Sequence, residues 1–79
     1  GPVRNGGIAM DKIIVDARGL SCPQPVILAR RAIKEGAFPI EVWVDTATSR
    51  DNVTRAAEKL GCAVQVSEAD EEFRLTLTR

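Results

Sequence analysis

The residue best suited to chemistry is Cys22, which is followed by Pro23 and Pro25 at the expected start of a helix. A thiolate attacks sulfur readily, so sulfur transfer and thiol exchange are its natural reactions. The 79-residue sequence contains no histidine, which excludes Cys-His and Ser-His pairs and removes the imidazole from common zinc sites. A reactive Cys22 must therefore rely on other groups to stabilise its thiolate.

A helix start is one such group. Its first backbone N–H groups have no intrahelical partner, and the helix dipole stabilises an anion there by about 0.3–1 kcal/mol. Two registers are open, and both tolerate proline in the first turn. In one, Cys22 is the N-cap and both prolines fall in the first three positions. In the other, Ser21 is the N-cap and Gln24 completes a capping box.

Hydrophobic periodicity predicts the element order βαβαββ, with Cys22 between the first strand and the first helix. The expected strands are 12–16, 40–45, 62–67 and 73–78, and the expected helices are 23–35 and the segment between the polar loop 45–49 and Gly61. The expected fold class is α/β, as an α+β two-layer sandwich in which two helices cover one face of a four-stranded mixed sheet. Ile14 and Trp43 are expected on the uncovered face.

One domain is expected at residues 10–79, because a chain of this length forms a single core. Residues 1–9 are interpreted as an added tag or disordered leader. No segment resembles a signal peptide or a membrane span, so we expect a cytoplasmic protein with no membrane partner. Eleven Lys+Arg balance eleven Asp+Glu, and this zero net charge argues against direct DNA binding.

The segment around Cys22 resembles the TusA/SirA/YedF-like family of sulfur carriers, and LSCPQPVI at residues 20–27 is most similar to the YedF branch. The family's CPxP motif, Asp-x-x-Gly-Leu-x-Cys-Pro-x-Pro, is matched by Asp16, Gly19, Leu20, Cys22, Pro23 and Pro25. The resemblance covers essentially all of residues 12–79, includes a second similar segment at 45–51, and implies the same βαβαββ sandwich.

The resemblance also implies a function. Cys22 would accept sulfane sulfur as a persulfide from a cysteine desulfurase or another persulfide donor, and would relay it to a downstream acceptor protein. The relay serves tRNA thiolation or other sulfur or selenium metabolism, with no metal and no organic cofactor. YedF modules are often fused to a second domain, so it stays open whether this is an excised domain. Whether such a sulfurtransferase-type carrier counts as an enzyme also stays open.

Other residues are expected near Cys22. If the first two strands are parallel, both strand-to-helix loops leave the same sheet edge, which brings Asp45 and Arg50 beside Cys22. Arg50 then either stabilises the thiolate or persulfide, or pairs with Asp45 or Asp51.

Three further residues are given structural roles. Asp16 is expected to order its own loop, and Gly19 to satisfy a backbone requirement. Cys62 is expected in the core or on a sheet face, with a resolving thiol as the alternative. A redox pair between Cys22 and Cys62 requires α-carbons within about 7 Å.

A basic stripe on the first helix is the candidate docking surface: Ile27 is flanked by Arg30, Arg31 and Lys34. Such a patch suits an acidic groove on a partner, although it can also be an ordinary solvated face. The acidic turn at 68–72 is expected far from it. The competing function is a non-catalytic protein- or RNA-binding regulatory module that uses this basic face.

Overall fold

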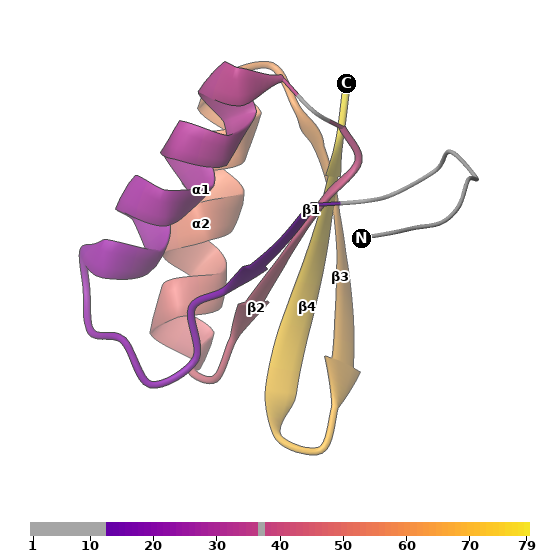
Figure 1. Cartoon of the computed structure of the whole chain (residues 1–79). Helices are drawn as coiled ribbons and strands as arrows, with labels where there is room; N and C mark the ends of the chain where they lie inside the picture. The colour runs from indigo at the N-terminus through magenta and orange to yellow at the C-terminus, as the bar shows by residue number, and fades with distance from the viewer. Residues whose placement is uncertain (1–12, 37) are drawn as a thin grey trace, which may run out of the picture.

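A four-stranded sheet with two helices packed on one face is the architecture of the computed structural model, which describes residues 13–36 and 38–79 (Figure 1). The elements, in chain order, are β1 (Ile13–Asp16), α1 (Gln24–Glu35), β2 (Ile40–Val44), α2 (Ala47–Lys59), β3 (Ala63–Ala69) and β4 (Glu72–Thr78). The expected βαβαββ order and α+β sandwich are confirmed. The predictions for residues 1–9 and for a strand start at Lys12 lie outside the described residues. Neither helix of the described part is long and apolar enough to cross a bilayer.

The sheet has the strand order β1-β2-β4-β3, and only β4 runs against the other three strands. Both helices therefore begin at the edge where β1 and β2 end (Figure 1). Because β3 runs parallel to these strands, its following acidic turn reaches the same edge. Arg18 Nη1 lies 3.0 Å from Glu72 Oε2 across that edge, so the hairpin contacts the loop that precedes α1.

The core lies between the sheet and the helices. Alternating residues of β2 and β4 have no exposed surface: Ile40, Val42, Val44, Leu75 and Leu77. Burying a side chain of this size contributes about 1.5–3 kcal/mol. The helices meet them through small residues such as Ala29 and Ala57, which are both fully buried. Cys62 belongs to this cluster at 6% exposure, which confirms its expected place in the core.

Local chemistry sets the ends of α2 and of the hairpin. The Thr46 side chain accepts a hydrogen bond from the Ser49 N–H at 3.1 Å, and Gly61 follows the helix with a φ of +88°. The hairpin turn is shorter than predicted. Asp70 and Glu71 have φ values of 52° and 64°, and two positive φ angles form the tight turn that matches the twist of paired strands.

The sheet face opposite the helices carries Trp43 between two guanidinium groups. Arg18 and Arg74 lie 4.8 and 4.6 Å from the ring centroid, and Trp43 Nε1 donates to Glu41 Oε1 at 2.7 Å. Ile14 is 50% exposed and lies opposite Glu41 in the parallel register. Both residues expected on the uncovered face are therefore found there.

Asp16 is bound by the arginine two residues later. The Arg18 side chain donates to both carboxylate oxygens at 2.8 Å and its backbone N–H adds a third bond at 3.2 Å. These bonds, those from the side chain above all, lower the pKa of Asp16 to about 2. Because the folded pKa lies below the unfolded value, the stabilisation is present above about pH 4 and is lost as the pH falls towards 2.

We predict that Arg18→Gln raises the pKa of Asp16 from about 2 towards its ordinary value, because the charged donor is removed while the bond from the backbone N–H of residue 18 remains. Carboxyl-carbon NMR titration measures this shift directly. Arg74→Gln is the matched control, since Arg74 contacts the same Trp43 ring and makes no bond to Asp16. An Asp16 that titrates at about 4 in the unaltered protein would contradict the proposed cause.

Candidate functional site

Cys22 lies in the loop between β1 and α1, which begins with a tight turn. The Ala17 N–H donates to the Trp43 C=O at 2.8 Å and so continues the pairing of β1 with β2. The Leu20 N–H then donates to the Ala17 C=O at 3.4 Å. Gly19 is the third residue of this turn, and its φ of +78° is the angle that favours glycine there. No atom lies within 4 Å of a Cβ built at Gly19, so the backbone angle alone accounts for the residue.

A second turn leads into α1. The Gln24 N–H donates to the Ser21 C=O at 2.9 Å, which places Cys22 and Pro23 at the two central positions. Pro23 is the N-cap, and its C=O accepts from the Ile27 N–H at 3.1 Å. Both predicted registers are therefore wrong, because the helix begins after Pro23 rather than after Cys22 or Ser21.

The turn explains this shift. It satisfies the first helical N–H from the preceding backbone, so no side-chain cap is required. Pro25 takes the second helical position, where its missing N–H has no intrahelical partner to lose, and its ring is fully buried. Pro25 thereby anchors the helix start to the core. Cys22 stands just outside the helix, exposed, at the positive end of the dipole.

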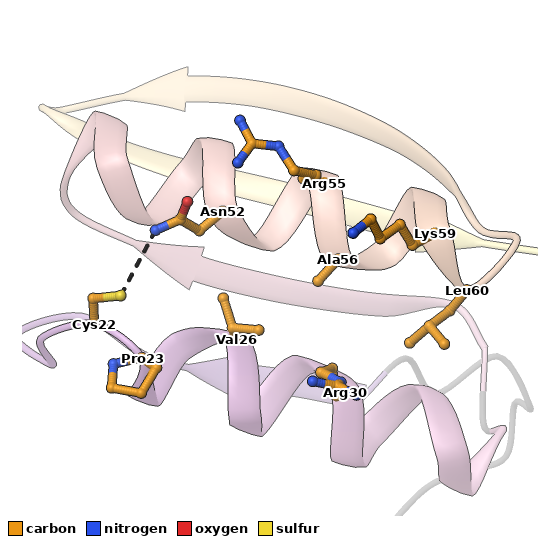
Figure 2. A pocket seen from close by; sticks show the side chains of 9 residues that line it. All are labelled: Cys22, Pro23, Val26, Arg30, Asn52, Arg55, Ala56, Lys59 and Leu60. Carbon is orange, nitrogen blue, oxygen red and sulfur yellow. Dashed lines mark hydrogen bonds between the residues drawn. The ribbon is translucent and has the colours of Figure 1, made fainter.

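The thiol of Cys22 opens onto a groove between the two helices, with a volume of about 530 Å³ (Figure 2). Residues spaced three to four apart form each wall, as expected for one face of a helix. The α1 side consists of Pro23, Val26 and Arg30. The α2 side consists of Asn52, Arg55, Ala56, Lys59 and Leu60.

Asn52 gives Cys22 a polar neighbour from the other helix. Its Nδ2 donates to Cys22 Sγ at 3.8 Å, and the sulfur points towards α2 (Figure 2). An amide donor stabilises a thiolate more than a thiol, because the anion is the better acceptor. Sequence reasoning missed Asn52. The available signal was its position one turn into the second helix, at the sheet edge shared with Cys22.

Three cations line the groove: Arg30, Arg55 and Lys59. Within residues 13–36 and 38–79 none of them forms an ion pair. Sequence reasoning placed Arg30 on a docking face and missed the other two. Placing Arg55 and Lys59 in the groove requires knowledge of how the two helices pack on each other. Knowing which loops share a sheet edge is not sufficient.

Arg50 takes the second of its two predicted roles. Its Nε donates to Asp51 Oδ1 at 2.9 Å, and its guanidinium lies 4.8 Å from the centroid of the Phe73 ring. It is absent from the groove lining and makes no hydrogen bond to Cys22 in the described structure. The cations that line the groove beside Cys22 are therefore Arg30, Arg55 and Lys59, and not the expected Arg50.

Asp45 does lie beside the Cys22 loop. Its Oδ2 accepts from the Gly19 N–H at 2.9 Å and so ties the loop before α1 to the loop before α2. Asp16 instead bonds Arg18, which orders its own loop as expected. Of the predicted supporting residues, Asp45 is thus the one that joins the two loops.

The docking residues gather on the outer face of α1, where they line a second, smaller hollow: Ile27, Arg30, Arg31 and Lys34. Ile27 is 43% exposed, and Leu20 in the Cys22 loop is 38% exposed. Apolar side chains therefore stand near Cys22 within a basic surface.

The two cysteines are free thiols in different surroundings, Cys22 exposed and Cys62 buried. Cys22 contacts Asn52 near the start of α2, whereas Cys62 follows its end. The helix rises about 12 Å between Asn52 and Leu60. The structure therefore does not bring the two thiols together as a redox pair requires.

Comparison with known proteins identifies the family to which this chain is similar. The family model described as sulfurtransferase TusA matches residues 13–79. A crystal structure of a SirA-like protein from Desulfitobacterium hafniense is similar at 35% identity and a TM-score of 0.78, covering 82% of this chain and 93% of that one. A search of curated proteins finds no match. The narrower similarity to the YedF branch stays a prediction. Since the family model spans nearly all of the described chain and the folds agree, this chain belongs to the TusA/SirA-like family.

Proposed function

We propose that this protein is a sulfur carrier that holds sulfane sulfur as a persulfide on Cys22 and relays it to an acceptor protein. The carrying observation is an exposed thiol at a helix N-terminus, with the Asn52 amide 3.8 Å from its sulfur. Membership of a sulfurtransferase family supports the same role. A purely regulatory binding module has no need of this arrangement around Cys22.

Loading is a thiol exchange. The Cys22 thiolate attacks the outer sulfur of a donor persulfide, the donor S–S bond breaks, and its electron pair leaves with the donor as a thiolate. A new S–S bond joins that sulfur to Cys22, and the proton of the outer sulfur stays on it. In delivery, an acceptor thiolate attacks the same outer sulfur and Cys22 leaves as a thiolate. Both steps are redox-neutral transfers of one sulfur atom.

The same groups assist both steps, because each has a thiolate on Cys22 as reactant or product. The helix dipole and the Asn52 amide stabilise that anion as nucleophile and as leaving group. The exposed position before the N-cap lets a second protein reach the sulfur. The bond between Asp45 and Gly19 holds the loop in place while partners change.

The proposed partners are a cysteine desulfurase or another persulfide donor, and a downstream acceptor. A carrier must release one partner before it binds the next, which suits charge-steered docking. The outer face of α1 offers such a surface in Ile27, Arg31 and Lys34. An acidic partner surface with an apolar recess complements it.

The first prediction concerns the loaded residue. Incubation with a cysteine desulfurase and cysteine, or with inorganic polysulfide, should add about 32 Da on Cys22, the mass of one sulfur atom. Intact mass and non-reducing peptide mapping measure it. Cys62→Ser should load normally, because Cys62 is buried. Equal loading of Cys22→Ser would refute the proposal.

The second prediction concerns the Asn52 amide. Asn52→Asp keeps the shape but replaces a donor with a negative charge, so alkylation of Cys22 by iodoacetamide at neutral pH should slow about threefold to tenfold. Asn52→Ala should have a smaller effect. Gln65→Glu is the matched control, since this exposed residue lies on β3 away from the groove. An unchanged rate in Asn52→Asp would exclude the assigned role.

The third prediction concerns protein docking. The double variant Arg31→Glu/Lys34→Glu should load from the desulfurase about tenfold more slowly at low salt, because the charge that steers the partner is reversed. Its loading by inorganic polysulfide should not change. Arg74→Glu, on the opposite sheet face, controls for charge reversal away from the patch, and each single variant, Arg31→Glu or Lys34→Glu, has the same change in net charge as this control. If both reagents load the double variant equally slowly, the patch is not a partner surface.

A further inference from the structure

The groove continues beyond Cys22, and the proposed sulfur relay does not use this part of it. Its α2 wall runs from Asn52 to Lys59, over which an α-helix rises about 11 Å (Figure 2). Three apolar residues line it: Val26, Ala56 and Leu60. Its volume of about 530 Å³ lies within the range of about 300–1,000 Å³ for small-molecule sites.

The charges along this groove are of one sign. Arg30 on α1 and Lys59 on α2 line its part beyond Cys22, and Arg55 extends from the α2 wall (Figure 2). No carboxylate is among the lining residues. The cations Arg18 and Arg50, by contrast, are paired with carboxylates. Arg30, Arg55 and Lys59 form no ion pair within residues 13–36 and 38–79, and cations of this kind beside an apolar surface suit a ligand with carboxylates and a short apolar stem.

We propose that the groove binds a low-molecular-weight persulfide that bears carboxylates, of the size of a tripeptide thiol, as a direct sulfur donor to Cys22. This inference rests on the proposed carrier function and names a substrate class for the same thiol. An extended tripeptide spans about 10–11 Å, close to the helical rise along the α2 wall. Its sulfur lies at Cys22, one of its carboxylate arms lies along the groove towards Arg30 and Lys59, and the methylene groups of that arm contact Val26.

The groove matches the length of a short chain segment. The Cys22–Asn52 contact marks one end and Leu60 the other, where the chain leaves α2 for β3 (Figure 2). About three extended residues fill that length. A protein partner has the outer face of α1 available, where a second hollow around Ile27 and Arg31 shares only Arg30 with the groove.

The exchange balances without a further reagent. The Cys22 thiolate attacks the outer sulfur of R–S–SH, the S–S bond of the donor breaks, and its electron pair leaves on RS⁻. The new S–S bond forms on Cys22, and the outer sulfur keeps its proton. Solvent protonates RS⁻, and nothing is oxidised or reduced overall.

The test uses glutathione persulfide as the donor and mass spectrometry of the whole protein as the readout. Loading should saturate with donor concentration, and Lys59→Glu should raise the half-saturating concentration about threefold to tenfold. Lys59→Gln should give a smaller rise, and circular dichroism checks that both variants fold. Arg74→Glu, which has the same change in net charge but lies on the opposite sheet face, should match the unaltered protein.

A second donor isolates the carboxylates. The persulfide of glutathione diethyl ester should load the unaltered protein with a higher half-saturating concentration than the free acid, and Lys59→Glu should not change it. The inference is overturned if acid and ester behave alike. It is also overturned if Lys59→Glu slows loading by a desulfurase but not by glutathione persulfide, which assigns the groove to a protein donor. Both failures leave sulfur on Cys22 and the carrier proposal intact, whereas failure of every donor to load Cys22 refutes the carrier itself.

Discussion

The parallel direction of β1 and β2 is the constraint on which the site depends. A parallel pair requires a crossover, and α1 provides it by running back across the sheet. The same applies to α2, because β3 also runs parallel to β2 with β4 between them. Both helices must therefore start at one sheet edge and lie side by side on one face (Figure 1). The thiol and the groove exist because these two helix starts are neighbours.

Short hydrogen bonds convert this shared edge into a defined site. The bond from Gly19 to Asp45 joins the loops that precede the two helices, and the turn at Ser21 to Gln24 sets where α1 begins. Buried Pro25 then fixes the helix start to the core. As a result, Cys22 is exposed yet held by a rigid framework, which a carrier that meets successive partners needs.

Because the sequence contains no histidine, other polar groups must act on the Cys22 thiol. A helix end and the Asn52 amide are the polar groups beside the Cys22 sulfur. The balanced net charge conceals an uneven distribution, since Arg30 and Lys59 on the helices form no ion pair with the residues that the structure describes. Arg18 is paired with Asp16 and Glu72. The groove is therefore positive in a chain that is neutral overall.

The sequence by itself determined the elements, their order, much of the core and which of the two cysteines is the candidate for chemistry. Period-two and period-3.6 patterns report burial directly, so the alternation around Val42 and the helical spacing around Val53 were sufficient. A glycine indicates its own backbone requirement, which is why Gly61 could be placed after the second helix from the sequence alone. These features depend on neighbours in the chain.

Tertiary structure alone decided the helix register, the partner of Arg50 and the groove. Pro23 is the N-cap because of the turn that precedes it. The alternative helix starts differ from this one by the free energy of only about one hydrogen bond, and sequence patterns do not resolve so small a difference. Asn52 and Lys59 reach the thiol groove only because α2 packs against α1, at separations of thirty residues and more. Such contacts depend on how the two amphipathic helices pack together. The sequence of either helix by itself does not show which residues of the other helix it will contact.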